Sequence, residues 1–336
     1  MAIDVSVIVP CYNEARTIGS LLEAIADQTY PIDSLEVIVS DGGSTDATRA
    51  ILSEHTRSRP QAQVRVVDNP DRSIPAALNR AIAVASGNVI VRLDAHAVPP
   101  PTYIARCVEV LTETQAANVG GVWDIRPGAE GWLARAIAVA VSHRLGAGDA
   151  GYRAGARAGE TDTVPFGAFD RRWLERIGLF NEQLLTNEDY EYNYRIRQAG
   201  GKVWLDPTIR CVYFARPTLT ALARQYWRYG FWKAHMLRRY PRSLRLRQAI
   251  PPAFVAALLI LSMASLFSPV AAIGWIALTA LYLAVLLGAA LLRSVRGRDI
   301  SLMVGLPAAW ATVHVCWGAG FLVGLVAALA QRRGHD

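Results

Sequence analysis

Short apolar runs alternate with amphipathic segments over the first hundred residues of the chain. The apolar runs have the length and composition of strands buried on both faces of a parallel sheet. They lie at Val5–Val9, Leu35–Val39, Val64–Val67 and Val89–Leu93. Between them, segments such as Ala15–Gln28 and Ile74–Ser86 place apolar residues at helical spacing. Strands that alternate with helices indicate βαβ units, so this part is predicted to be an α/β fold with a parallel sheet.

The pattern is less regular after residue 100. It predicts a strand at Gly120–Ile125, helices at Trp132–His143, Arg171–Ile177 and Asn187–Ala199, and short strands at Lys202–Leu205 and Ile209–Phe214. The segment Tyr152–Asp162 is rich in Gly, Ala and Arg and is predicted to be a mobile loop. Next, Leu219–Tyr240 mixes aromatic residues with Arg and Lys, a composition typical of an amphipathic helix at a membrane interface.

The last part of the chain is apolar. From Ala249 to Ala330 the charged residues are confined to one short gap, Arg293–Asp299. The segments 249–267 and 270–292 are each close to the roughly 20 residues that span a bilayer. The segment 302–330 is long for one span and short for two. We therefore expect a catalytic-sized domain at 1–217, an amphipathic basic interfacial helix at 218–248, and a membrane region at 249–330.

Charge sets an expected topology for this membrane region. The arginines near the first span and after the second, Arg238–Arg247 and Arg293–Arg298, are both expected on the cytoplasmic side. The segments 249–267 and 270–292 should therefore form a hairpin that crosses the membrane and returns. A third span would place Arg332 and Arg333 outside, against the charge rule. Because Pro307 and two glycines also interrupt it, 302–330 is expected to be re-entrant or to lie partly in the interface.

Composition narrows the partners and the compartment. The formal net charge is +7. The Arg residues cluster beside the apolar tail, which favours anionic lipid headgroups over nucleic acid as the partner. The four cysteines are far apart, without metal-ligand spacing, and are expected to be reduced and packed. Asp4 and an immediate strand at the N-terminus argue against a signal peptide, so the first domain should stay in the cytoplasm.

Candidate chemistry gathers where the predicted strands end. Asp94-Ala95-His96 follows the fourth strand, and ligands of open α/β sheets bind beyond the carboxyl ends of the strands. A carboxylate and an imidazole there could hold a divalent cation against a diphosphate. Asp41 ends the second strand before a glycine turn, where it could bind a ligand or serve only as a turn residue. Neither G-x-G-x-x-G nor the P-loop motif is present, which disfavours dinucleotide oxidoreductases and P-loop enzymes.

Five short motifs follow one another along the chain. They are Pro10-Cys11-Tyr12-Asn13-Glu14, Ser40–Asp46, Asp94-Ala95-His96, Asn187-Glu188-Asp189 and Gln225-Tyr226-Trp227-Arg228-Tyr229. Together they resemble family 2 glycosyltransferases, inverting enzymes with a GT-A fold, over roughly residues 3–230. The nearest resemblance is to the membrane-bound succinoglycan type of exopolysaccharide biosynthesis. It implies a Rossmann-like mixed sheet flanked by helices, followed by an interfacial helix and transmembrane helices.

The resemblance also implies roles for individual residues. Asp189, paired with Glu188, takes the position of the catalytic base. Asp94 and His96 replace the usual D-x-D and would hold the metal. The nucleotide-sugar donor would be bound by Pro10, Tyr12, Glu14, Asp41, Arg72, Asp94, Gln225 and Arg228. The last two belong to a stretch that resembles the Q-x-x-R-W motif of processive synthases, with Tyr229 in place of Trp.

The implied cofactor is a divalent cation, Mn²⁺ or Mg²⁺. Histidine as a ligand favours Mn²⁺ somewhat, because imidazole suits transition metals better. The implied reaction moves a hexose, with UDP-hexose the expected donor and GDP-mannose an alternative, to a polyprenyl-diphosphate-linked saccharide. The implied location is a bacterial inner membrane, multi-pass, with the catalytic domain on the cytoplasmic face. The alternatives are a polyprenyl-phosphate monosaccharide synthase, a nucleotidyltransferase and a non-catalytic membrane scaffold.

Overall fold

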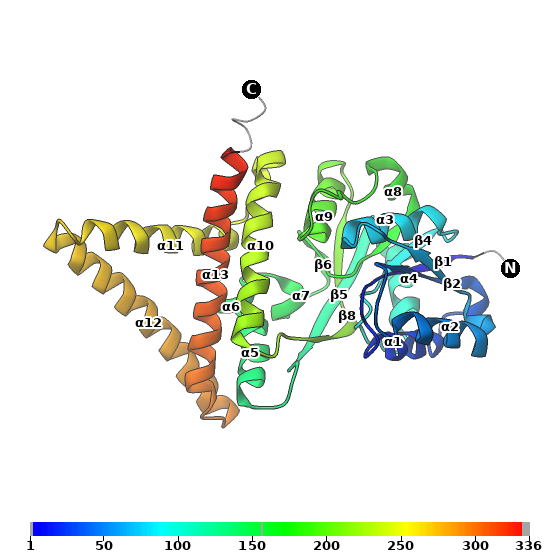
Figure 1. Ribbon diagram of the computed structural model, residues 1–336, viewed down its shortest axis with the longest axis horizontal. Coiled ribbons are helices and arrows are strands. Elements are labelled where there is room, and N and C mark those ends of the chain that lie inside the picture. Colours follow the sequence, from blue (N-terminus) through cyan, green and yellow to red (C-terminus); the bar gives the residue numbers. More distant parts are fainter. Residues whose placement is uncertain (1–2, 156, 331–336) are drawn as a thin grey trace. The chain divides into compact units, whose positions relative to one another are not determined.

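The computed structural model describes residues 3–155 and 157–330, which form two compact units (Figure 1). The first unit holds the chain up to Asp124 and the segment from Gly155 to Tyr213. The second holds the segment from Ile125 to Ala154 and the chain from Phe214 onward. The expected domain 1–217 was continuous. In the structure, its stretch 125–154 packs instead with the C-terminal helices.

The first unit is built on a mixed sheet. Its parallel part contains β1 (Val5–Cys11), β2 (Leu35–Asp41), β3 (Val64–Asp68) and β4 (Val89–Arg92). Here β1 lies between β2 and β4, with Val5 opposite both Leu35 and Val89. All four predicted strands are present. Over the described residues the whole sheet has the order β3-β2-β1-β4-β7-β5-β8-β6.

Helices follow the parallel strands; those after β1 and β3 lie where the sequence pattern predicts them, whereas the helix after β4 was not predicted. They are α1 (Ile18–Ala26), α2 (Thr48–Ser58), α3 (Ile74–Val84) and α4 (Tyr103–Thr114). Helix α1 buries Ile18, Leu21 and Leu22, the stripe that its helical spacing predicts. Helix α3 begins where the Ser73 side chain accepts a hydrogen bond from the Ala76 amide. Two 3₁₀ turns, Ile32–Ser34 and Pro60–Ala62, complete the connections.

The remaining strands of this unit pair antiparallel. They are β5 (Asn118–Arg126), β6 (Gly159–Glu160), β7 (Ala168–Asp170) and β8 (Val203–Phe214), with helices α8 (Arg171–Ile177) and α9 (Glu188–Gln198). The two short strands expected near 202–214 form one strand, β8, because Pro207 lies within it without ending it. The expected loop 152–162 contains part of a short helix, α7 (Gly151–Ala154), and strand β6, while residue 156 lies outside the described residues.

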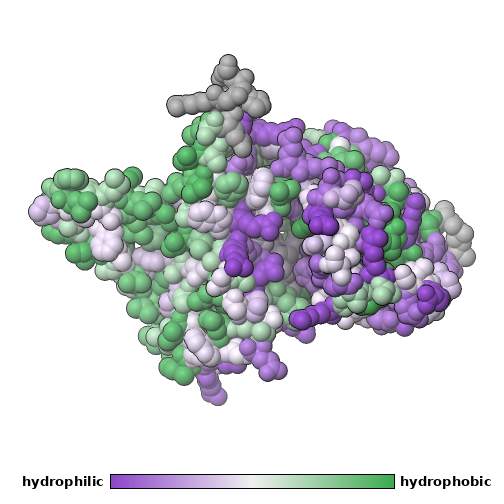
Figure 2. Space-filling model, viewed as in Figure 1, coloured by the Kyte–Doolittle hydropathy of each residue, from purple (hydrophilic) through white to green (hydrophobic). Residues whose placement is uncertain are grey.

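The second unit is helical. It contains α5 (Trp132–Ser142), α6 (Arg144–Ala147), α7, α10 (Leu219–Arg239), the 3₁₀ turn Pro241–Ser243, α11 (Leu246–Ala264), α12 (Pro269–Gly297) and α13 (Leu302–Ala330). Of the described helices, α11, α12 and α13 are long and apolar enough to cross a membrane. Their surface is largely hydrophobic in Figure 2. Helix α13 is continuous despite Pro307, so it contains no chain reversal of the kind a re-entrant loop needs.

Candidate active site

The centre of the site is a buried arginine that the sequence analysis did not single out. Arg92 is the last residue of β4 and is 3% exposed. Its Nη2 lies 3.0 Å from Oδ1 of Asp94 and 3.0 Å from Oε1 of Glu188. Its Nη1 donates to Oδ1 of Asp189. One guanidinium therefore joins the residue beyond the fourth strand to the acidic pair of α9 and brings these predicted site residues together.

The backbone explains this meeting. Arg92 donates its amide to the carbonyl of Gly167, which holds the end of β4 against the β7 side of the sheet. Helix α9 begins after Asn187, whose φ of 68° turns the chain so that Glu188 and Asp189 occupy the first turn. Free amides at a helix start favour such carboxylates. The end of β4 and the start of α9 thus bring three carboxylates to the guanidinium of Arg92.

Burial dominates the ionisation of Asp189. It raises the pKa of this carboxyl to about 7, with Glu188 and Asp94 adding to the rise and Arg92 opposing it. The sequence-based expectation was that the helix N-terminus would keep Asp189 ionised. The structure adds burial and two neighbouring acids, so Asp189 can take up and release a proton near neutral pH. That behaviour suits a general base.

Asp94 and His96 lie at the open end of this cluster, with side chains 22% and 38% exposed. His96 Nδ1 lies 3.4 Å from Oε1 of Glu14, which is in the loop after β1. Burial raises the pKa of Glu14, but hydrogen bonds from His96 and Thr17 lower it overall. Among the described residues no three His, Cys, Asp or Glu side chains form a ready metal cage. Two accessible ligands would leave a bound cation to complete its shell with phosphate oxygens and water, as Mg²⁺ commonly does.

A second part of the site lies where the loops after β1 and β2 meet. The Asn13 amide donates to Ser44 Oγ at 2.8 Å, and the Thr45 amide donates to Asn13 Oδ1 at 2.8 Å. The Glu14 amide donates to Thr48 Oγ1 at 2.9 Å. These bonds hold the Pro10–Glu14 stretch against the turn at Gly42-Gly43. The first two predicted motifs therefore form one continuous rim.

Tyr12 and Arg72 face each other on this rim. The Arg72 guanidinium lies 5.5 Å from the centre of the Tyr12 ring, and its Nε donates to the Gly42 carbonyl at 3.1 Å. Tyr12 is 44% exposed. A side chain at Gly42 would come within 3.1 Å of that ring, so glycine permits the contact. An exposed aromatic ring beside a cation can hold a nucleobase and a phosphate.

Asp41 lies behind the rim, not on it. Its side chain is fully buried and receives bonds from Ser44 Oγ at 2.5 Å and Arg49 Nε at 2.6 Å. Burial raises the pKa of Asp41, but these partners lower it overall, so the group stays ionised. In this arrangement Asp41 stabilises the turn through Ser44 and Arg49. Its direct contact with a donor stays a prediction.

Gln225 and Arg228 belong to α10, in the second unit. Within that unit, Gln225 Nε2 donates to the Tyr229 hydroxyl at 3.1 Å. The Tyr226 hydroxyl accepts from Arg153 at 3.3 Å. Both bonds are local to the second unit, so the predicted donor contact of Gln225 and Arg228 remains a prediction.

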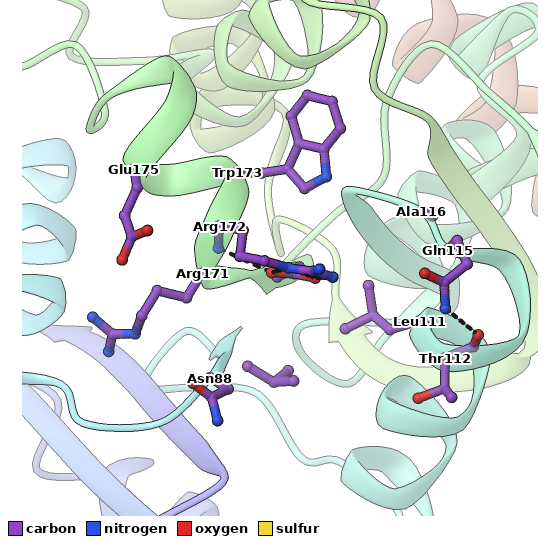
Figure 3. A pocket seen from close by; sticks show the side chains of 11 residues that line it. Asn88, Leu111, Thr112, Gln115, Ala116, Arg171, Arg172, Trp173 and Glu175 are labelled. Atoms are coloured by element: carbon purple, nitrogen blue, oxygen red, sulfur yellow. Dashed lines mark hydrogen bonds and ion pairs between the residues drawn. The ribbon is translucent and has the colours of Figure 1, made fainter.

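A cavity of about 550 Å³ lies elsewhere in the first unit (Figure 3). It is lined by Asn88 and Val89, at the start of β4, and by α8 residues such as Trp173. Its polar groups pair with one another: Arg172 with Asp170 at 2.5 Å, and Gln115 with the Thr112 carbonyl at 2.8 Å. The cavity lies at the amino end of β4, whereas Asp94 follows the carboxyl end. We therefore do not assign it to the site.

Comparison with known proteins defines the class. The model of glycosyl transferase family 2 matches residues 6–178, about half of the chain. The chain belongs to this family, has its GT-A fold and is a glycosyltransferase of the exopolysaccharide type.

Particular relatives agree with this class. The chain is 32% identical to succinoglycan biosynthesis protein ExoA of Rhizobium meliloti, over 73% of each chain. It is 27% identical to a dolichyl N-acetyl-α-D-glucosaminyl phosphate 3-β-D-2,3-diacetamido-2,3-dideoxy-β-D-glucuronosyltransferase of Methanococcus voltae, over 70% of this chain and 74% of the relative.

Among solved structures, the chain is similar to the mannosyltransferase PcManGT of Pyrobaculum calidifontis, solved in complex with GDP-Man and Mn²⁺. The identity is 25%, the TM-score 0.63, and the coverage 93% of this chain and 87% of the other. A Staphylococcus aureus TarS fragment bound to UDP-GlcNAc shares the fold at a TM-score of 0.51 and 16% identity, over 99% of this chain and 92% of the fragment.

Proposed function

We propose that this glycosyltransferase moves a hexose, with inversion, from a nucleotide-sugar to a lipid-linked saccharide. The observation that carries the proposal is the cluster of Asp94, Glu188 and Asp189 around Arg92, at the carboxyl end of β4. The cluster supports the proposal because it lies beyond the carboxyl end of a strand, where an α/β fold binds its ligands, and contains both the candidate base and a candidate cation ligand.

Asp189 is the proposed base. An acceptor hydroxyl is a poor nucleophile at neutral pH, so its proton must leave as the new glycosidic bond forms. Asp189 can accept that proton because burial places its pKa near 7. Glu188 is more enclosed, with 10% of its side chain exposed against 28% for Asp189. We therefore assign proton transfer to Asp189 and assign to Glu188 the task of holding Arg92.

Asp94 and His96 are the proposed cation ligands. A divalent cation, when bound, supplies the positive charge that stabilises the departing diphosphate. Both side chains are accessible, and Glu14 holds the His96 ring by its Nδ1. A partner on one ring nitrogen orients the ring for a ligand at the other. The mannosyltransferase solved with GDP-Man and Mn²⁺ supports the same role here.

The rim formed by Pro10–Glu14 and the glycine turn is the proposed seat of the nucleotide. Tyr12 offers a ring face for the base, and Arg72 offers a cation for a phosphate. Asp41 stiffens the rim from behind. Gln225 and Arg228 are proposed to contact the diphosphate and the acceptor.

The acceptor is proposed to be a polyprenyl-diphosphate-linked saccharide, with a polyprenyl phosphate as the alternative. Lipid-linked acceptors suit a chain that carries apolar helices as well as a transferase unit. We propose that the protein is held in the cytoplasmic membrane of a bacterium, with the transferase unit facing the cytoplasm, where nucleotide-sugars are made.

One experiment tests the proposal. Membranes that contain the protein are incubated with a panel of labelled UDP- and GDP-sugars, and label is counted in the lipid extract. Membranes with the Asp189→Asn variant are the matched control. We expect one sugar to enter the lipid fraction only with the unchanged protein, in a product whose anomeric configuration is opposite to that of the donor. Transfer with retained configuration, or no transfer from any donor, would contradict it.

A further inference from the structure

Helices α10 and α13 of the second unit touch backbone to backbone. A Cβ placed on Gly320 of α13 would lie 2.3 Å from the Trp227 carbonyl oxygen, and one on Gly324 would lie 2.6 Å from that of Phe231. A Cβ on Gly230 of α10 would lie 2.1 Å from the Trp317 carbonyl oxygen. The contact residues move forward in step along the two helices, from Trp227 and Gly320 to Phe231 and Gly324. The helices therefore run side by side in the same direction (Figure 1).

This pairing ties α13 to a charged neighbour. Helix α10 carries the exposed residues Arg224 and Arg228 beside its contact with Gly320. Gly320 lies well inside α13, which runs from Leu302 to Ala330. If α13 crossed a bilayer, these two arginines would be carried toward the hydrocarbon centre. Charged side chains there are costly unless they face a protein interior or a water-filled cavity.

The contacts of α13 with α5 and α6 also argue against a membrane crossing by α13. Trp310 Nε1 donates to the Ala140 carbonyl of α5 at 3.1 Å, and His314 Nε2 lies 2.6 Å from the Leu145 carbonyl of α6. Arg135 and Arg144, on these two short helices, are exposed. The chain also leaves helical geometry between α5 and α6, and lipid-exposed irregular backbone does not occur within hydrocarbon.

Helix α11 relates to α13 in a different way. It crosses α13 where a Cβ on Gly318 would lie 2.5 Å from the Pro251 carbonyl oxygen and where Trp317 Nε1 donates to the Gln248 carbonyl at 3.1 Å. From there α11 extends steeply away from the α13 axis, and α12 returns (Figure 1). The turn between them has highly exposed apolar residues, with Phe267 at 89%. Two helices thus leave the α10–α13 pair, and their far end is apolar.

We propose that α13 lies along the membrane surface and that only the α11–α12 hairpin enters the bilayer deeply. The partner of α13 is the cytoplasmic leaflet, and this inference rests on the proposed membrane location. Val304, Val315 and Val326 form its lipid-facing stripe: they are 67%, 42% and 67% exposed, and a spacing of 11 residues is close to three helical turns. The arginines of α10, α5 and α6 lie toward the headgroups and water. The motif Gln225–Tyr229 is then held at the level where a lipid-linked acceptor presents its sugar.

Depth measurement along α13 tests this arrangement. Spin labels are attached to Val304→Cys, Val315→Cys and Val326→Cys variants in a Cys316→Ala background, reconstituted in vesicles with anionic lipid. The three other native cysteines are buried, and burial raises the pKa of Cys11 and Cys211 to about 12, which disfavours the thiolate that reacts with the label. Phe267→Cys is the deep control. Label depth follows from power saturation with oxygen and with a water-soluble nickel chelate.

We expect the three α13 labels to lie within about 5 Å of one common depth, and the Phe267→Cys label to lie deeper. In a crossing helix the ends lie about 16 Å along the axis from position 315. A label at 315 that is more than about 10 Å deeper than both others would overturn the surface arrangement while leaving the membrane location intact. Protein that does not float with the vesicles would overturn both.

Discussion

The Arg92 guanidinium lies 3.0 Å from the Glu188 carboxylate, and this ion pair joins the end of β4 to the start of α9. The two residues are 96 positions apart and are both nearly buried, at 3% and 8% exposed. Removal of Arg92 would leave the neighbouring carboxylates without their shared positive charge, and breaking a buried pair in this way costs about 3–5 kcal/mol. This buried pair therefore holds the end of β4 against the start of α9, next to the proposed base and cation site.

Replacing Arg92 should disorganise the site. Arg92→Met leaves three neighbouring carboxylates without their shared cation, so we expect turnover to fall by at least about 100-fold, since misplaced catalytic groups lose about that much. Arg92→Lys keeps the charge but loses the fork, and it should recover part of the rate. The measurement is the rate of sugar transfer with saturating donor and Mn²⁺.

Arg172→Met is the matched control for Arg92→Met. Arg172 also pairs with an aspartate, Asp170, but its side chain is 80% exposed. An exposed pair contributes about 0–1 kcal/mol, so activity and stability should stay close to those of the unchanged protein. Equal losses in the two variants would show that Arg92 has no special place in the site.

The proposed base gives a second prediction. Asp189→Asn should lower turnover by about 10²–10⁴-fold, the usual contribution of a positioned base. Donor affinity should be nearly unchanged, because the Tyr12–Arg72 rim lies on other loops. Titration of the nucleotide, followed by calorimetry, checks binding separately from turnover. Unimpaired turnover, or an equal loss of donor affinity, would contradict the assignment.

The raised pKa of Asp189 gives a third prediction, with a definite sign. The base works only when ionised, so kcat/KM should rise with pH through about 7 and then level off. Below that value the rate should fall about tenfold per pH unit. Arg92 lowers the pKa of Asp189. Arg92→Lys keeps the positive charge, so the rise of kcat/KM should stay near the same pH. Arg92→Met removes the charge and should move this rise to higher pH. A flat profile between pH 5 and 8 would exclude Asp189 as the titrating base.

The cation site gives a fourth prediction. A chelator should abolish transfer, and Mn²⁺ should restore it at least as well as Mg²⁺, because His96 is an imidazole ligand. His96→Asp recreates the paired-carboxylate motif and should shift the preference toward Mg²⁺. The shift is read from activation curves and from Mn²⁺ binding followed by EPR. Full activity in excess chelator would remove the metal role from Asp94 and His96.

Sequence reasoning found the parallel strands because each is a short apolar run between turn residues, and the strand ends pointed to Asp94. It did not find Arg92, since an arginine at the end of an apolar strand looks like an ordinary boundary residue. Only the long-range pairing of β4 with β7 and the start of α9 shows its three partners. The ion pair that accompanies the burial of Asp41 was also not predicted, because its partner Arg49 comes from the following helix.

The segment from Ile125 to Ala154 shows a different limit. Its apolar helix at 132–143 was predicted, and α5 confirms it at Trp132–Ser142. Its place with the C-terminal helices was not predicted, because the partner residue Trp310 lies about 170 positions away in sequence. Contacts of this range leave no periodic signal in either segment.

The close contact between α10 and α13 gives a last prediction, on stability. Gly320→Ala places a methyl group 2.3 Å from the Trp227 carbonyl oxygen, so the two helix backbones must separate. Overpacking of this kind typically costs about 1–3 kcal/mol. Gly288→Ala is the matched control, because Gly288 also lies within an apolar helix but has nothing within 4 Å of the added Cβ. There the better helix propensity of alanine should leave stability unchanged or raise it by up to about 1 kcal/mol. Loss of helical circular dichroism on heating in detergent micelles measures both. We expect Gly320→Ala to melt several degrees below Gly288→Ala, and identical melting curves would mean that α10 and α13 are not in backbone contact in the folded protein.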